Sequence, residues 1–159
     1  MSREILRAIL KNDIKKLDLL LSEGENIMET THNEKWSYLH RALLSIAMPP
    51  STEMIESLLK RGLDINAIDV YGNAPIHYAA ILKKSNLIEL LVKEGADINV
   101  VNIEGVSPLK QLLLSKPYDY ASMRILIHAN ADIDQSLKEF VKITSNGDQE
   151  LLSIFDMNK

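Results

Sequence analysis

The 159-residue chain is about one domain long, and its content of 46% hydrophobic and 25% charged residues is typical of a folded globular protein. Its formal net charge of −4 lacks the positive excess that binding to phosphate backbones requires, so we expect no nucleic-acid partner. The chain has no cysteine, which excludes disulfides, thiolate nucleophiles and cysteine-based metal sites.

The first segment, MSREILRAILKND, carries charges where a signal peptide needs an uninterrupted apolar stretch. No apolar run approaches the roughly eighteen residues that a membrane span needs. We therefore expect a soluble, cytoplasmic protein without a membrane partner. Residues 2–22 predict two helices with no turn motif before them, and Gly24 follows them as a helix-ending residue.

Three later segments end alike: LLKRGLDINA at 58–67, LVKEGADINV at 91–100 and LIHANADIDQ at 126–135. Gly62, Gly95 and Asn130 occupy the same place in them, just past an apolar stretch with helical spacing. Glycine and asparagine adopt the left-handed backbone conformation that ends a helix most readily. These three residues therefore mark the ends of three equivalent helices.

A second set of similar segments precedes each of these helices: WSYLHRALL, NAPIHYAAI and VSPLKQLLL. They align so that His40, His77 and Lys110 correspond. Pro75 and Pro108 stand where the first turn of a helix tolerates a missing N–H group. The chain is thus predicted to repeat a unit of two helices.

The stretch DVYGNAPIHYAA, at 69–80, followed by LIELLVKEGADIN resembles the ankyrin repeat, a unit of about 33 residues with a turn and two helices. The resemblance covers nearly the whole chain. It departs from the family pattern at HNEK, residues 32–35, where the family has Asp and Gly, and at Lys110, which replaces a histidine. It implies an all-α fold: an ankyrin-repeat solenoid of about five stacked helix pairs with short hairpin-like turns.

The repeat boundaries divide one domain, residues 1–159, into five parts. We expect an N-terminal cap at 1–29, repeats at 30–66, 67–99 and 100–134, and a C-terminal cap at 135–159 in which Gly147 and Asp148 separate two helices. A single repeat leaves its apolar face uncovered, so the stability of such a chain comes from stacking.

The histidines offer candidates for chemistry, but their context favours a structural role. The resemblance implies that His77, and likewise His40, hydrogen-bonds backbone groups between repeats. His32 and His128 lie in different repeats without a second histidine at helical spacing, so we expect no metal and no cofactor.

No catalytic motif is evident along the chain. It contains no glycine-rich phosphate loop and no G-x-S-x-G motif. Aspartates recur with the repeat period, as turn and cap residues do, and the pair Lys83 and Lys84 is interpreted as a solvated helix face. We therefore expect no enzyme and no small-molecule substrate.

Partner binding is then the expected activity, and the resemblance implies a concave face built from turn tips and inner helices. We expect Trp36, Tyr71 and Ile103 to lie at equivalent turn tips on this face. The alternative is that Trp36 and Tyr78 only pack between adjacent turns. The full set of candidate partner-binding residues is Asn33, Glu34, Trp36, Arg41, Val70, Tyr71, Asn73, Tyr78, Ile103, Glu104, Val106 and Gln111.

A second surface competes with the concave face. The loops at 46–52 and 115–121 are longer than their counterpart in the central repeat, and Pro49, Tyr118 and Tyr120 could form a rigid rim there. Loops also tolerate insertions at little thermodynamic cost, which would leave this rim without a function. The sequence leaves open which surface forms the interface.

The leading functional hypothesis is a non-catalytic inhibitor or immunity-type protein that binds and neutralises a partner protein. The chain is similar to bacterial ankyrin-type immunity proteins, and its acidity would suit a basic toxin or effector. The alternatives are a host-directed effector or viral mimic of the I-kappa-B inhibitors, and a general ankyrin scaffold or adaptor. The partner, the class of source organism and the oligomeric state stay open at this point.

Overall fold

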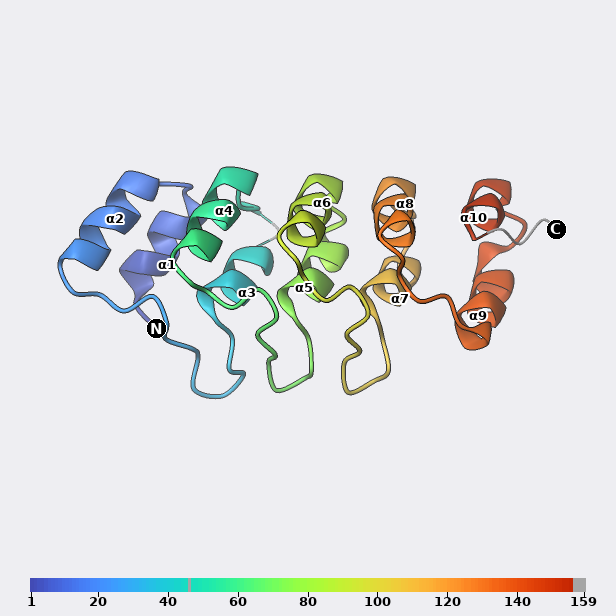
Figure 1. The fold of residues 1–159 in the computed structure, drawn as a ribbon, viewed down its shortest axis with the longest axis horizontal. Helices are drawn as coiled ribbons and strands as arrows, with labels where there is room; N and C mark the ends of the chain where they lie inside the picture. Colours follow the sequence, from blue (N-terminus) through green and yellow to red (C-terminus); the bar gives the residue numbers. More distant parts are fainter. Residues whose placement is uncertain (46, 156–159) are drawn as a thin grey trace.

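The computed structural model describes residues 1–45 and 47–155, and this part of the chain forms ten α-helices and no β-strand. Successive helices pair, and the five pairs stand side by side in one row (Figure 1). The all-α solenoid of five helix pairs is thus confirmed. The helices are α1 (Arg3–Leu10), α2 (Ile14–Ser22), α3 (Tyr38–Leu43), α4 (Thr52–Lys60), α5 (Pro75–Leu82), α6 (Ser85–Lys93), α7 (Pro108–Leu113), α8 (Tyr120–His128), α9 (Gln135–Ser145) and α10 (Gln149–Ile154).

Local signals set the ends of these short helices. The hydroxyl of Ser107 accepts the backbone N–H of Lys110 at the start of α7, and the Asp134 side chain caps α9 in the same way. Pro75 and Pro108 occupy the first position of α5 and α7, as predicted. The predicted helix ends at Gly62, Gly95 and Asn130 are also confirmed, since all three have positive φ angles.

The two ends of the stack are helix pairs. The first predicted pair is confirmed by α1 and α2, and the last by α9 and α10 with residues 146–148 between them. Residues 156–159 of the predicted C-terminal cap, and Ile46 of the predicted loop 46–52, lie outside the described part of the chain.

Three hairpin-like loops project from one side of the row, below α3, α5 and α7 in Figure 1. We call them finger 1 (residues 31–36), finger 2 (68–73) and finger 3 (101–106). Each is closed by a backbone hydrogen bond near its base, such as that from the N–H of Asp69 to the carbonyl of Asn73. The chain enters α9 directly from residues 131–134, so finger 3 is the last of the series.

Backbone hydrogen bonds join each finger to the next. The N–H of Val70 donates to the carbonyl of Glu34 in finger 1, and the N–H of Ile103 donates to the carbonyl of Tyr71 in finger 2, each over 3.0 Å. Side chains add a second row of contacts, because Oδ1 of Asn66 and of Asn99 accepts the N–H of the aspartate one repeat later. The fingers are therefore held in register.

Finger 3 packs so closely on finger 2 that residue 72 has no room for a side chain. Gly72 and Gly105 occupy equivalent turns with φ angles of +75° and +68°. A Cβ atom on Gly72 would lie 3.0 Å from backbone atoms of Asn102 and Ile103, whereas one on Gly105 would meet nothing within 4 Å.

We expect Gly105→Ala to lower the free energy of unfolding by about 1 kcal/mol through its left-handed backbone alone. Gly72→Ala should cost about 1–3 kcal/mol more, because the added methyl group also pushes finger 3 away. Urea denaturation followed by circular dichroism measures both values. Equal losses in the two variants would show that the fingers do not need this close approach.

Candidate partner-binding surface

His77 ties the start of α5 to the next finger. The backbone N–H of Ala74 donates to Nδ1 of His77 over 3.1 Å. The ring proton must therefore sit on Nε2, which donates to the carbonyl of Val106, the last residue of finger 3, over 3.0 Å. The predicted structural role of His77 is confirmed.

His40 repeats this geometry one unit earlier. Its Nδ1 accepts the N–H of Ser37 over 3.2 Å, and its Nε2 lies 3.1 Å from the carbonyl of Asn73 at the end of finger 2. Both rings are fully buried. Desolvation lowers the pKa of His40 and of His77 below the ordinary value of 6.5, so both rings resist the protonation that would break this pattern.

Lys110 holds the third equivalent position, and its departure from histidine has a structural reason. Within the described residues no finger follows finger 3, so the carbonyl that a ring at this position would bond is missing from that part of the chain. The ammonium group of Lys110 instead lies 5.9 Å from the ring centre of Phe140 in α9, a cation–π contact with the last helix pair.

A buried carboxyl group organises the base of finger 2. One oxygen of Asp69 accepts the N–H groups of Tyr71 and Asn73 over 2.8 and 2.9 Å. The other accepts the indole N–H of Trp36 over 3.0 Å and the hydroxyl of Tyr78 over 2.5 Å. Burial, followed by the hydrogen bond to Asp69, raises the pKa of Tyr78 to about 12. This network crosses from finger 1 to α5.

The network shows how Trp36 and Tyr78 pack within the protein. Both side chains pack between adjacent fingers, and Trp36 lies at the base of finger 1, where its carbonyl accepts the N–H of Thr31, and not at the tip as expected. Tyr78 and Val106 are each 6% exposed and offer a partner little area. Trp36 keeps one partly exposed face, over which the Arg41 guanidinium lies 5.5 Å from the ring centre.

The tips of fingers 2 and 3 carry large apolar side chains exposed to solvent. Val70, Tyr71 and Ile103 are 48%, 47% and 74% exposed. The prediction that Tyr71 and Ile103 hold equivalent positions is wrong: Ile103 corresponds to Val70, since each donates its N–H to the finger before it. The backbones of Tyr71 and Ile103 are instead adjacent, because a hydrogen bond joins them across the step between the fingers. We call these three residues the tip surface; they are exposed apolar residues on a backbone fixed by hydrogen bonds.

The remaining candidates surround this patch with polar groups. Asn33 and Glu104 are exposed, whereas Glu34, Asn73 and Gln111 are partly buried. Asn73 is also committed within the protein, since its Oδ1 accepts a hydrogen bond from Asn102 over 3.0 Å. The structure therefore narrows the exposed apolar part of the predicted face to the tip surface.

The long loop at 115–121 contacts the elements on either side of it. The Tyr118 hydroxyl donates to the carbonyl of Thr144 over 3.0 Å, and the Tyr120 hydroxyl donates to Asp148 over 2.6 Å, so both tie the loop to the last helix pair. Lys83 is partly exposed at the end of α5, and its ammonium group donates to the carbonyls of Ser115 and Pro117. These contacts brace the loop against its neighbours.

Within residues 1–45 and 47–155, no three histidine, aspartate or glutamate side chains gather in a way that could hold a metal ion. None of the helices in this part of the chain is long and apolar enough to cross a membrane.

The family follows from the repeated unit and is supported by sequence comparison. The family model described as ankyrin repeats (3 copies) matches residues 5–102 and, in a second placement, residues 46–137. The chain belongs to the ankyrin repeat family. Ankyrin repeats generally act as scaffolds that bind other proteins. A comparison with curated proteins finds no match.

Sequence reasoning missed the exposed side chains at the end of this ankyrin stack. Val101 is 59% exposed, and Asp132 and Asp134, just before α9, line the same cavity on its opposite side. One sequence signal was available: the third repeat lacks its histidine, and no turn motif separates residues 130–134 from the last helix pair. The missing motif leaves finger 3 without a neighbour.

The buried histidines make stability depend on pH. In the unfolded chain a histidine takes up a proton near its ordinary pKa of 6.5, whereas His77 in the folded protein does so only at lower pH. Its contribution is therefore fully present above pH 6.5 and is lost as pH falls below that value, by at most about 1.4 kcal/mol per pH unit for each histidine.

We expect His77→Gln to show a smaller loss of unfolding free energy between pH 7 and pH 5 than the wild type, with His40 still contributing. His32→Gln, which removes an exposed histidine from finger 1, is the matched control and should keep the wild-type slope. Urea denaturation at half-unit pH steps measures these slopes. If His77→Gln has the same slope as the wild type, His77 does not contribute to the pH dependence of stability.

Proposed function

We propose that this ankyrin repeat protein is a non-catalytic inhibitor that holds a partner protein on its tip surface and neutralises it. The observation that carries this proposal is the backbone adjacency of Tyr71 and Ile103, two residues whose large apolar side chains are exposed at neighbouring finger tips. Aromatic and large apolar side chains of this kind supply most of the binding energy at protein interfaces.

The construction of the fingers favours tight binding. The backbone at Tyr71 donates to Asp69, its carbonyl is bound by Ile103, and finger 2 is tied through His40 to α3. A surface that is already ordered loses little conformational entropy when a partner binds. A partner covering the tip surface with the polar groups around it would bury on the order of 800 Å² of this protein, the size of a standard specific interface.

The charge of the chain supports a basic partner, such as a toxin or effector neutralised by an immunity-type protein. The formal net charge is −4, and Glu34 and Glu104 stand next to the tip surface in fingers 1 and 3. Acidic groups around an apolar patch speed the approach of a positively charged protein and disfavour acidic competitors.

The site itself is tested by Tyr71→Ala. With the partner captured from the source cells on immobilised protein, we expect this change to weaken binding by roughly 2 kcal/mol, or about thirtyfold, while the melting temperature stays nearly unchanged. Leu19→Ala is the matched control, since Leu19 on α2 has the same 47% exposure but lies away from the fingers. Equal affinities of Tyr71→Ala and wild type would remove the tip surface from the interface.

Inhibition is tested separately from binding. Adding the protein in increasing amounts to the captured partner should abolish that partner's activity at one equivalent, and Tyr71→Ala should need correspondingly more protein. A partner that stays fully active in the complex would make this chain a scaffold or adaptor, with the interface unchanged.

A further inference from the structure

Finger 3 is the last finger in the row, and one of its backbone carbonyl groups accepts no hydrogen bond from the described residues. The carbonyls of Glu34 in finger 1 and Tyr71 in finger 2 each accept an N–H group from the next finger. Glu104 is the equivalent residue of finger 3, and within residues 1–45 and 47–155 no N–H group donates to its carbonyl. Gly105 beside it has nothing within 4 Å of where a Cβ atom would stand. The edge is open where a fourth finger would continue the series.

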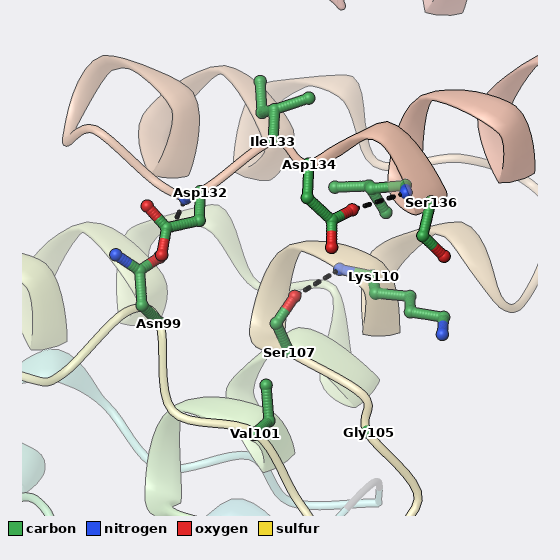
Figure 2. Close-up of a pocket in the computed structure, with 10 residues that line it drawn as sticks. Asn99, Val101, Gly105, Ser107, Lys110, Asp132, Ile133, Asp134 and Ser136 are labelled. Carbon is green, nitrogen blue, oxygen red and sulfur yellow. Dashed lines mark hydrogen bonds between the residues drawn. The ribbon is translucent and has the colours of Figure 1, made fainter.

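The space for that fourth finger is an open cavity of 450 Å³ between finger 3 and the start of α9. We call it the notch; Val101, Gly105, Lys110, Asp132, Asp134 and Leu137 contribute to its walls. Figure 2 shows Asp132 and Asp134 along one rim, with Val101 and Gly105 on the opposite side. The notch therefore has apolar and polar walls and an acidic rim, and Gly105 in its wall directly follows Glu104, whose carbonyl accepts no N–H group from the described residues.

The surrounding helices limit what can enter. In an ankyrin stack each finger is followed by its own helix pair, but here that position is already filled, since α9 packs on α7 and α10 packs on α8. A folded repeat, including one from a second copy of this chain, would collide with α9 and α10. An extended segment brings no helices with it, so it avoids this collision.

The carboxylates on the rim of the notch favour a segment that carries a positive charge. Asp132 and Asp134 are exposed, and neither forms an ion pair with any residue in the described part of the chain. One oxygen of Asp134 caps α9 by accepting the N–H of Leu137, which leaves the other free. Figure 2 shows the Lys110 ammonium group pointing away from both carboxylates. The rim is thus complementary to a lysine or arginine side chain.

We propose that the notch binds an extended segment of a partner protein that carries a basic side chain. A backbone N–H of the segment donates to the Glu104 carbonyl, as Val70 and Ile103 do to the fingers before them. Its basic side chain pairs with Asp132 and Asp134, and a neighbouring apolar side chain packs on Val101 and Leu137. This site goes beyond the proposed function, because the tip surface takes no part in it.

The probe is a synthetic peptide with the sequence of finger 2 and its flanking residues. The nonapeptide AIDVYGNAP, residues 67–75, and nine variants with arginine at each position in turn are titrated into the ¹⁵N-labelled protein. We expect the peptides to shift the amide signals of Gly105 and Leu137, and at least one arginine variant to bind more tightly than the parent. Absence of these shifts at millimolar peptide would overturn the proposal.

Matched substitutions then locate the bound peptide. Ser136→Trp fills the notch from the exposed first turn of α9 and should weaken binding by about tenfold or more, whereas Gln135→Trp, on the same turn outside the notch, should not. Circular dichroism and melting curves establish that both variants are folded. Undiminished binding to folded Ser136→Trp would place the peptide elsewhere.

The charge requirement has its own pair of variants. Asp132→Asn should weaken the best arginine peptide by about fivefold and leave the parent peptide nearly unaffected. Asp97→Asn, at the equivalent position beside the space that finger 3 already fills, should change neither. Tyr71→Ala should also leave peptide binding unchanged, so failure of the tip surface and failure of the notch are distinguishable. Equal losses in Asp132→Asn and Asp97→Asn would reject the basic segment.

Discussion

A neutral, buried histidine that bonds backbone groups of two successive repeats is the contact on which the arrangement of the fingers depends. At His77 one ring nitrogen accepts an N–H at the start of its own helix and the other donates to the end of the next finger. One side chain thus fixes both a helix start and the distance to the following finger. The ring has to stay uncharged to do so, and its burial lowers its pKa accordingly. Where the row of fingers stops, a lysine replaces the histidine and contacts the last helix pair instead.

The rigidity of the fingers separates residues that hold the structure from residues that can hold a partner. Asp69 draws Trp36 and Tyr78 into a network between fingers 1 and 2, which uses their polar atoms within the protein and leaves Tyr78 buried and Trp36 partly exposed. Tyr71 and Ile103 carry no such side-chain duty, and they lie side by side on a backbone that the same network fixes. The apolar groups left exposed at the tips are therefore presented by an ordered surface, which favours specific binding.

The two ends of an ankyrin stack face a common physical problem, since a repeat without a neighbour exposes apolar surface. This chain covers its last full repeat with the helices α9 and α10 but supplies no finger to match them. Helix packing is complete there, while the backbone edge of finger 3 and the notch beside it are not. The tip surface and the notch thus have different origins. The tip surface results from the apolar residues at the tips of fingers 2 and 3, whereas the notch results from the absence of a finger before the last helix pair.

Local sequence determined the elements of this protein, because each signal acts within a few residues of itself. Pro75 starts a helix, Gly95 and Asn130 end helices, and the spacing of His40 and His77 marks the repeat, so the five helix pairs could be predicted without coordinates. Only the tertiary structure decided which side chains of different repeats hydrogen-bond to one another. Whether Trp36 binds outward or packs inward depends on Asp69, which lies in the next repeat, and the open edge at Glu104 exists only because no donor from elsewhere in the described chain reaches it. Contacts across repeats depend on distances that composition and periodicity do not encode.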